Sequence, residues 1–130
     1  MSTQVRPADL ACHSKAIRLP FPALAGGLRE LLGAKLVAYV GSVRETRAVR
    51  EWAEGQRGPS SVAVERRLRL AYEVALCIAD VDGPEIAQAW FQGLNPLLND
   101  VSPARLLREG KLDDVGPLVI AAERQFLAGG

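Results

Sequence analysis

Apolar residues recur every three or four positions along most of this chain, a spacing that predicts amphipathic α-helices. The most regular stretch runs from about residue 60 to residue 81 and carries two apolar stripes, one including Val64 and Leu68 and the other including Val74 and Val81. A helix that is apolar on two sides is buried on two sides. We therefore expect the longest helix here, with Ser60 or Ser61 as its N-cap, joining the parts of the chain on either side of it.

Shorter helices are predicted before this segment by the same spacing and by the residues that stop them. Asp9 is suited to cap a first helix, and prolines at positions 20 and 22 are expected to end it. Gly33 and Gly55 follow two further apolar segments, where a glycine commonly ends a helix. The helices expected in this half cover residues 9–17, 23–32, 35–40 and 45–54.

Proline and glycine also mark the ends of the helices predicted in the second half of the chain. Pro84 suits the first turn of a helix, and Gly93 suits the position just past its end. Asn95-Pro96 predicts a turn. Ser102-Pro103 is a good N-cap followed by a good first helical residue, and Gly110 is expected to end that helix in the left-handed conformation.

The last helix is expected to start at Asp114, because this places Pro117 in the first turn, where a missing N–H costs little. The residues after Gln125 are apolar or small, and we expect them to form a flexible end that need not pack on its own domain. The apolar face of this helix consists of Val115, Leu118, Val119, Ala122 and Phe126.

Composition supports a helical protein of modest size. The 130 residues suffice for one domain or two very small ones, and a hydrophobic content of 48% with only 5% aromatic residues and few β-branched runs favours helices. We expect an all-α fold. Its parts are an N-terminal arm (1–22), a helix-turn-helix region (23–60), a connecting helix (61–82) and a small helical domain (83–130).

Charge divides the chain into two unlike halves. Residues 1–70 hold twelve Arg or Lys and six acids, whereas the remaining residues hold four Arg or Lys and nine acids. The overall charge of +1 conceals this asymmetry. It indicates two different partners, a polyanion for the first half and a basic protein surface for the second.

A short helix, the Gly41-Ser42 turn and another short helix give the outline of a helix-turn-helix. On the second helix the apolar side is expected to pack, and arginines gather near its start, the part that meets base edges in a major groove. The alternative is that these arginines form a solvated face paired with Glu51 and Glu54. The predicted DNA-binding residues are Arg44, Thr46, Arg47, Arg50 and Arg57.

The residues required for catalysis or metal binding are not grouped in the sequence. There is a single His, and no Ser or Cys has an evident base, so we expect neither an enzyme nor a cofactor. Cys12-His13 lacks a second cluster of ligands, and no metal site is predicted; Cys12 and Cys77 are expected to stay reduced. No apolar run is long enough for a membrane span, and we expect a soluble, cytoplasmic protein.

The second half of the chain resembles a known family. Trp90, Asn95-Pro96, Ser102-Pro103, Leu106-Leu107-Arg108, Gly110 and an acidic pair before a last helix are similar to the toxin-binding domain of Xre/MbcA/ParS-type antitoxins. A helix-turn-helix region precedes this domain in that family, a layout similar to the one predicted here. The resemblance covers roughly residues 28–126, and it departs between Val40 and Trp52, where this chain is longer than a tight turn followed by a recognition helix.

The resemblance implies an antitoxin of a type II system that binds a RES-type, NAD-degrading toxin and blocks its active site. It also implies binding to operator DNA for autoregulation, and two half-sites favour a homodimer. A stand-alone transcriptional regulator and an interaction module without DNA binding are the alternatives. The residues assigned to the toxin are Phe91, Asn95, Arg105 and Arg108 as a docking surface, Arg124 and Gln125 for polar groups of its cleft, and Phe126 and Leu127 as apolar anchors. Phe126 has the alternative role of completing the antitoxin's own core.

Overall fold

The computed structural model describes residues 6–129 and consists, over that range, of helices without a named strand, which confirms the all-α fold. The helices are α1 (Pro7–Arg18), α2 (Phe21–Leu32), α3 (Ala34–Val40), α4 (Thr46–Ala53), α5 (Val62–Asp82), α6 (Pro84–Gln92), α7 (Pro103–Glu109) and α8 (Leu112–Gly129), with a 3-10 turn, η1 (Pro96–Leu98), between α6 and α7. Residues 1–5 of the predicted N-terminal arm and Gly130 lie outside the described part. No helix in residues 6–129 is both long and apolar enough to cross a membrane.

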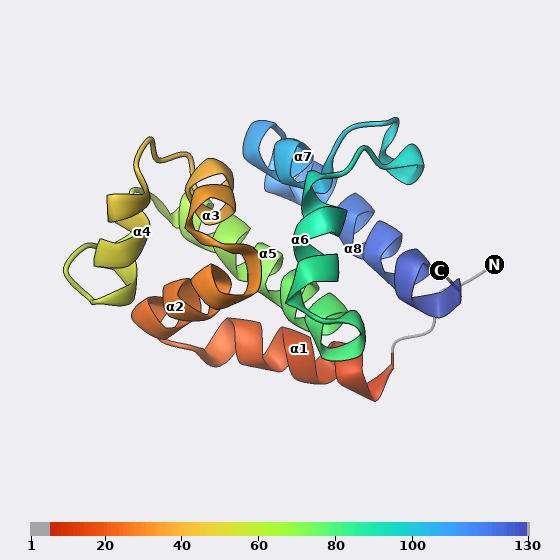
Figure 1. The fold of residues 1–130 in the computed structure, drawn as a ribbon, viewed down its shortest axis with the longest axis horizontal. Coiled ribbons are helices and arrows are strands. Elements are labelled where there is room, and N and C mark those ends of the chain that lie inside the picture. Colours follow the sequence, from red (N-terminus) through yellow and green to blue (C-terminus); the bar gives the residue numbers. More distant parts are fainter. Residues whose placement is uncertain (1–5, 130) are drawn as a thin grey trace.

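Helix α5 is the central element, as its two apolar stripes predict. It packs against α1, α2, α6 and α8, and it runs through the middle of the molecule in Figure 1. Ser61 is its N-cap and accepts a 3.1 Å hydrogen bond from the Val64 amide. Val81, expected in the second stripe, is instead 57% exposed because it lies in the last turn, past the packed part of the helix.

One hydrophobic core extends through the described residues, from Ala16 of α1 to Ala122 of α8. Its largest fully buried side chains include Trp52 of α4 and Phe91 of α6, which come from the two halves that the sequence distinguishes. The predicted helix-turn-helix region and the C-terminal helical region therefore share buried side chains across α5. The division into four domains stays a prediction.

Trp52 anchors α4 to its neighbours. The Trp52 ring meets the ring of Phe21 edge-on at a centroid distance of 5.7 Å, and its indole Nε1–H donates a 3.1 Å hydrogen bond to the Gly58 carbonyl. A Cβ at Gly41 would lie 2.7 Å from the Trp52 ring, so the turn before α4 needs a glycine there. The apolar side predicted for this helix is buried, with Ala48 and Val49 beside Trp52.

Two helix ends differ from the prediction. Gly110 follows α7 in an extended conformation, with φ −90° and ψ 166°, rather than in the left-handed one. A glycine is needed there because a Cβ would clash with the side chain of Val115 and lie 2.9 Å from the Leu106 carbonyl oxygen. At the end of α4, by contrast, Gly55 has the positive φ, +75°, that favours glycine.

The last helix also starts earlier than expected. Helix α8 begins at Leu112, and Pro117 therefore lies inside the helix rather than in its first turn. The acidic pair Asp113 and Asp114 occupies the first turn, where carboxylates favour the positive end of the helix dipole. Leu118, predicted on the packed face, is 54% exposed, since the buried face passes through Val115 and Val119 instead.

The first helix ends just before Pro20, as the prolines predict, and both prolines then belong to the start of the next helix. Pro20 is the N-cap of α2 and Pro22 lies in its first turn, a position that proline tolerates. Asp9 is the third residue of α1, and its carboxylate accepts a 2.8 Å hydrogen bond from the Arg6 amide. Proline and acidic residues thus start these helices.

The two cysteines are not separate thiols. Cys12 of α1 and Cys77 of α5 are joined as a disulfide, with their Cα atoms 6.0 Å apart. The prediction of reduced cysteines is corrected here, because 65 positions of sequence separate residues that the α1–α5 packing places side by side.

Candidate functional site: a basic helix face and a pocket shared by α3, α4 and α7

The outward face of α4 carries the arginines predicted to bind DNA. Arg47 and Arg50 have side chains that are 65% and 55% exposed, and Arg57, in the loop after α4, is 48% exposed. Arg44 and Thr46 are exposed as well, at the start of the helix. All five predicted residues are therefore accessible.

Carboxylates accompany three of these arginines. The distances from guanidinium nitrogen to carboxylate oxygen are 3.8 Å for Arg47 with Glu45, 4.0 Å for Arg50 with Glu54 and 3.5 Å for Arg57 with Glu51. Pairs this exposed and this loose contribute about 0–1 kcal/mol, so they do not prevent the arginines from turning to another anion. They are nonetheless the arrangement expected of a solvated face, the alternative that the sequence left open.

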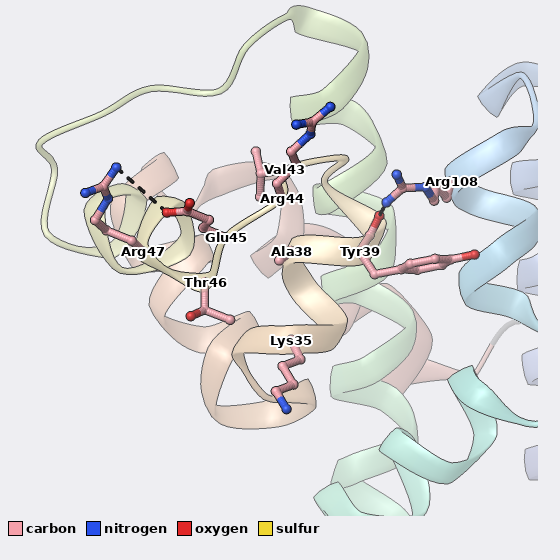
Figure 2. Close-up of a pocket in the computed structure, with 9 residues that line it drawn as sticks. All are labelled: Lys35, Ala38, Tyr39, Val43, Arg44, Glu45, Thr46, Arg47 and Arg108. Carbon is pink, nitrogen blue, oxygen red and sulfur yellow. Dashed lines mark hydrogen bonds and ion pairs between the residues drawn. The ribbon is translucent and has the colours of Figure 1, made fainter.

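A pocket of about 640 Å³ opens at the start of α4. Figure 2 shows that its side chains come from α3, from the turn and first residues of α4, and from α7. Lys35, Arg44, Arg47 and Arg108 supply four cations, and Glu45 is the carboxylate among the lining residues. The pocket therefore favours an anionic ligand.

Arg108 belongs to this pocket although the sequence assigned it to a different surface. From α7 it donates a 2.6 Å hydrogen bond from Nη1 to the Tyr39 carbonyl, and its guanidinium lies 4.7 Å from the centroid of the Tyr39 ring. Its side chain is half-buried. Arg108 thus holds α7 to the C-terminal end of α3, while it also lines a basic pocket with residues predicted to bind DNA.

A second arginine binds the same end of α3. Arg67 Nη1 donates hydrogen bonds of 2.9 Å to the Val40 carbonyl and 2.9 Å to the Ser42 hydroxyl. Burial, and then the nearby positive charge of Arg108, lowers the pKa of Arg67. Arg67 donates to the Val40 carbonyl, and Arg108 is a second donor to the Tyr39 carbonyl, which also accepts a 3.2 Å hydrogen bond from the Ser42 amide. Both positive charges match the negative end of the helix dipole.

The docking surface predicted for a toxin is only partly available. Phe91 is 0% exposed in the core, so its assignment to a partner surface is wrong: its ring packs edge-on against Trp90, at a centroid distance of 5.4 Å. Asn95 is half-buried, and its Oδ1 accepts a 2.9 Å hydrogen bond from the Leu97 amide at the start of η1. Arg105 is 59% exposed and pairs with Glu109 at 3.1 Å.

The C-terminal end is helical rather than free. Helix α8 continues to Gly129, and the expectation of a flexible segment after Gln125 is corrected over the described residues. Phe126 and Leu127 are half-buried and pack against the core, with the Phe126 ring 6.3 Å from that of Trp90. Gln125 is exposed and Arg124 half-buried. The structure therefore favours Phe126 as part of the chain's own core.

The sequence carried signals for features that the prediction missed. The exposed leucines of the α6–α7 connection, Leu94 at 75% and Leu97 at 61%, flank the Asn95-Pro96 turn and are available to a partner. Glu123 follows Val115 and Val119 at four-residue spacing, which places it on the apolar face of α8. Lys35 and Tyr39 gave no comparable signal, because only the fold brings α3 to α7.

No family model matches this chain. The family is identified instead by individual known proteins that are similar in sequence and in structure. The mycobacterial cidal antitoxin MbcA of Mycobacterium tuberculosis and that of Mycobacterium bovis are each 37% identical to this chain over 82 residues, which span 62% of this chain and 72% of the relative. A chain of the crystal structure of the M. tuberculosis MbcT-MbcA toxin-antitoxin complex matches with a TM-score of 0.61 and 28% sequence identity, covering 80% of this chain and 94% of that chain.

These matches place the chain in the class of antitoxins from toxin-antitoxin systems. The chain belongs to the MbcA antitoxin family. Its relatives are named as antitoxins rather than as enzymes, in agreement with the prediction from the sequence.

Proposed function

We propose that this chain binds and neutralises a RES-type, NAD-degrading toxin by blocking its active site, and that it also binds operator DNA through the exposed face of α4. The observation that supports the first part most directly is the likeness to a chain of a solved toxin-antitoxin complex. The RES-type identity of the toxin rests on the resemblance of residues 90–114 to that family. The chain is expected to act in the cytoplasm, where such a toxin would meet NAD.

The surface proposed for the toxin lies on the second half of the chain. It comprises the exposed leucines of the α6–α7 connection, Leu94 and Leu97, together with Arg105 on α7 and Gln125 near the end of α8. Exposed leucines supply apolar area, at about 25 cal/mol for each Å² that a partner covers. The acidic balance of this half favours encounter with a nucleotide-binding cleft, because such a cleft is expected to carry basic residues.

The blocking step has a different form from the one expected from the sequence. Phe126 is engaged with Trp90 inside the antitoxin, so it is not free to enter a cleft as part of an extended tail. We infer that a preformed helical surface of this chain covers the active-site cleft of the toxin. Leu127 contributes to that surface only by its exposed part.

The proposal for DNA rests on the exposed cations of α4 and its pocket. Lys35 and Arg44 form no ion pair within residues 6–129, and the other arginines of this face are held only loosely. A homodimer would present two such faces to two half-sites, which is how small helix-turn-helix proteins reach operator affinity. If these arginines form only a solvated face, the chain is instead an interaction module that does not bind DNA.

Co-expression tests the central proposal. The product of the neighbouring gene is expressed alone and together with this chain, while growth and cellular NAD are followed. Toxicity and NAD loss that disappear on co-expression, with the two chains co-purifying, support an antitoxin of a RES-type toxin. A neighbour that is harmless alone, or that stays toxic beside this chain, contradicts it. Operator binding without such a partner would favour the stand-alone regulator.

A further inference from the structure

Buried polar side chains meet where α1, α5 and α8 come together. Asp9, Cys77 and Glu123 are 4%, 3% and 4% exposed, and one potential ligand atom of each lies within 4.8 Å of those of the other two. Cys12 is adjacent through its disulfide to Cys77. The Asp9 and Glu123 carboxylates and the Cys77 sulfur thus share a site that is closed to solvent, and the Cys12 sulfur is bonded to one member of it.

Glu123 is the member of this cluster whose carboxylate has an oxygen without a hydrogen-bond partner in residues 6–129. Its Oε2 is buried and has no hydrogen-bond partner in the described residues. Burial, and then the charge of Asp9, raises the pKa of Glu123 to about 7. Burying a carboxylate without a partner is costly, so this oxygen requires a proton or a cation.

Asp9 is supported differently. Burial alone would raise its pKa, but hydrogen bonds from the Arg6 side chain and amide bring the pKa below its usual range. The Arg6 guanidinium is 2.9 Å from Asp9 Oδ1. Asp9 is therefore an anion within the cluster, and a second negative charge on Glu123 would lie close to it. The positive charges of Arg124 and Arg6 offset burial and the Asp9 and Glu73 charges only in part, so the pKa of Glu123 stays raised.

We propose that the chain whose Cys12–Cys77 disulfide has been reduced binds one Zn²⁺ ion at this cluster, with both thiolates and the carboxylates of Asp9 and Glu123 as ligands. A dithiol supplies the two electrons and two protons that convert the disulfide into two thiols, and itself becomes a disulfide. On binding, each thiol releases its proton, and Glu123 releases the proton it holds near neutral pH. The ion replaces the missing partner of Glu123 Oε2.

The donor set and its spacing suit zinc. Zinc prefers four tetrahedral ligands at about 2.0–2.3 Å, so neighbouring ligand atoms lie about 3.3–3.8 Å apart. The ligand atoms of Asp9, Cys77 and Glu123 are already within 4.8 Å of one another and need to close by about 1.5 Å or less. The Cys12 sulfur lies outside this group, and it must rotate into the fourth position once the disulfide is reduced. Thiolates select a soft or borderline ion over magnesium or calcium.

His13 lies outside this site, although it is next to Cys12 in the sequence. Its Nδ1 is 2.8 Å from the Glu73 carboxylate, and its side chain is 56% exposed. The sequence argument against a metal considered Cys12-His13 without a second cluster of ligands. Packing of α1 against α5 and α8 supplies the second cluster from residues that are more than 60 positions away.

Zinc titration of the reduced full-length chain tests the site. Thiols are kept reduced by a phosphine that does not bind zinc tightly, and bound Zn²⁺ is measured by competition with a chromophoric chelator, with Co²⁺ absorption as a reporter of thiolate ligation. We expect one ion per chain, a rise in the melting temperature on binding, and no binding by the oxidised chain. The substitutions Glu123→Gln and Cys77→Ser should each weaken binding by about tenfold or more.

The controls separate this site from surface binding and from unfolding. His13→Ala and Glu73→Gln alter the neighbouring exposed pair and should bind zinc as the parent does. Circular dichroism and melting of each metal-free variant verify the fold, and the nearly isosteric Glu123→Gln retains the shape of the side chain. Failure of the folded, reduced chain to bind micromolar Zn²⁺ overturns the proposal, as does equal binding by Glu123→Gln and the parent.

Discussion

Arg108 of α7 and Tyr39 of α3 are joined twice: a guanidinium nitrogen lies 2.6 Å from the Tyr39 carbonyl oxygen, and the guanidinium lies 4.7 Å from the centre of the Tyr39 ring. The pair connects the segment predicted to bind DNA to the segment predicted to bind a toxin. Neither half of the sequence shows this contact, because 69 positions separate the two residues.

Replacing Arg108 by alanine is expected to lower the free energy of unfolding by about 1–2 kcal/mol. The variant loses a charged hydrogen bond and a cation–π contact, while the Tyr39 carbonyl keeps its 3.2 Å hydrogen bond from the Ser42 amide. Chemical denaturation measures the change. Arg105→Ala, which removes an exposed arginine of the same helix, should cost less than about 0.5 kcal/mol; equal losses in the two variants would contradict the special role of Arg108.

Removing Arg47 and Arg50 together should weaken operator binding by about 1–3 kcal/mol for each lost base contact. The fold should be unaffected, since both side chains are exposed and their ion pairs are loose. Anisotropy titration at several salt concentrations gives the affinity and the number of phosphate contacts. Arg18→Ala, an exposed arginine on α1, is the matched control. Unchanged affinity in the double variant would identify the α4 face as merely solvated.

Deleting Gln125–Gly130 is expected to destabilise the chain, because the deletion removes the last turn of α8 and the Phe126–Trp90 contact. Phe126→Ala alone should lower the free energy of unfolding by about 1–2 kcal/mol, less than for a fully buried phenylalanine. Gln125→Ala, at an exposed neighbouring position, serves as the control. A deletion variant that melts like the parent, binds the toxin and fails to restore NAD would instead support a tail that enters the toxin's cleft.

The stability of the metal-free, disulfide-linked chain should fall as the pH rises from about 4.5 to about 7. Glu123 has a pKa of about 7 in the folded chain and near 4.5 when unfolded, so the folded state holds more protons in this interval. The contribution of Glu123 is fully present below the unfolded pKa and is lost as the pH passes the folded one, to a limit of the order of 3 kcal/mol. Asp9 acts in the opposite sense and only at lower pH, because its pKa is lowered on folding.

The substitution Glu123→Gln isolates this effect. It removes the titrating carboxyl and keeps the shape, so stability should become flatter with pH and exceed that of the parent at about pH 8.5. Denaturation at about pH 5.5 and at about pH 8.5, with a chelator present, makes the comparison. A parent and a variant with parallel pH profiles would show that Glu123 titrates normally.

The sequence predicted what local rules determine. Ser61 and Ser102 cap α5 and α7 as expected, and the buried stripe through Val64 and Leu68 follows from spacing alone. The predictions were wrong where the burial of a side chain depends on contacts with helices that are distant in the sequence. Phe91 looked available to a partner but fills the core, and the end of α8 looked free because its contact with Trp90 crosses from another helix.

Part of the candidate site could likewise be predicted from local rules, and part of it could not. The exposure of Arg47 and Arg50 follows from helix periodicity, since their neighbours on the opposite face are apolar. The pocket does not follow from it, because it needs Lys35 and Arg108 to meet across the fold. The cysteine link depends likewise on how α1 lies on α5.

That link makes residues 12–77 a closed ring of covalent bonds that contains all of α2, α3 and α4. The loop after α4 is exposed from Gly55 to Gly58 and includes an arginine, so a protease such as trypsin can reach it. A single cut there opens the ring without releasing a fragment. The nicked chain would migrate at full mass on a non-reducing gel and as two pieces once a thiol is added, and the surrounding helices would keep their shape around the break.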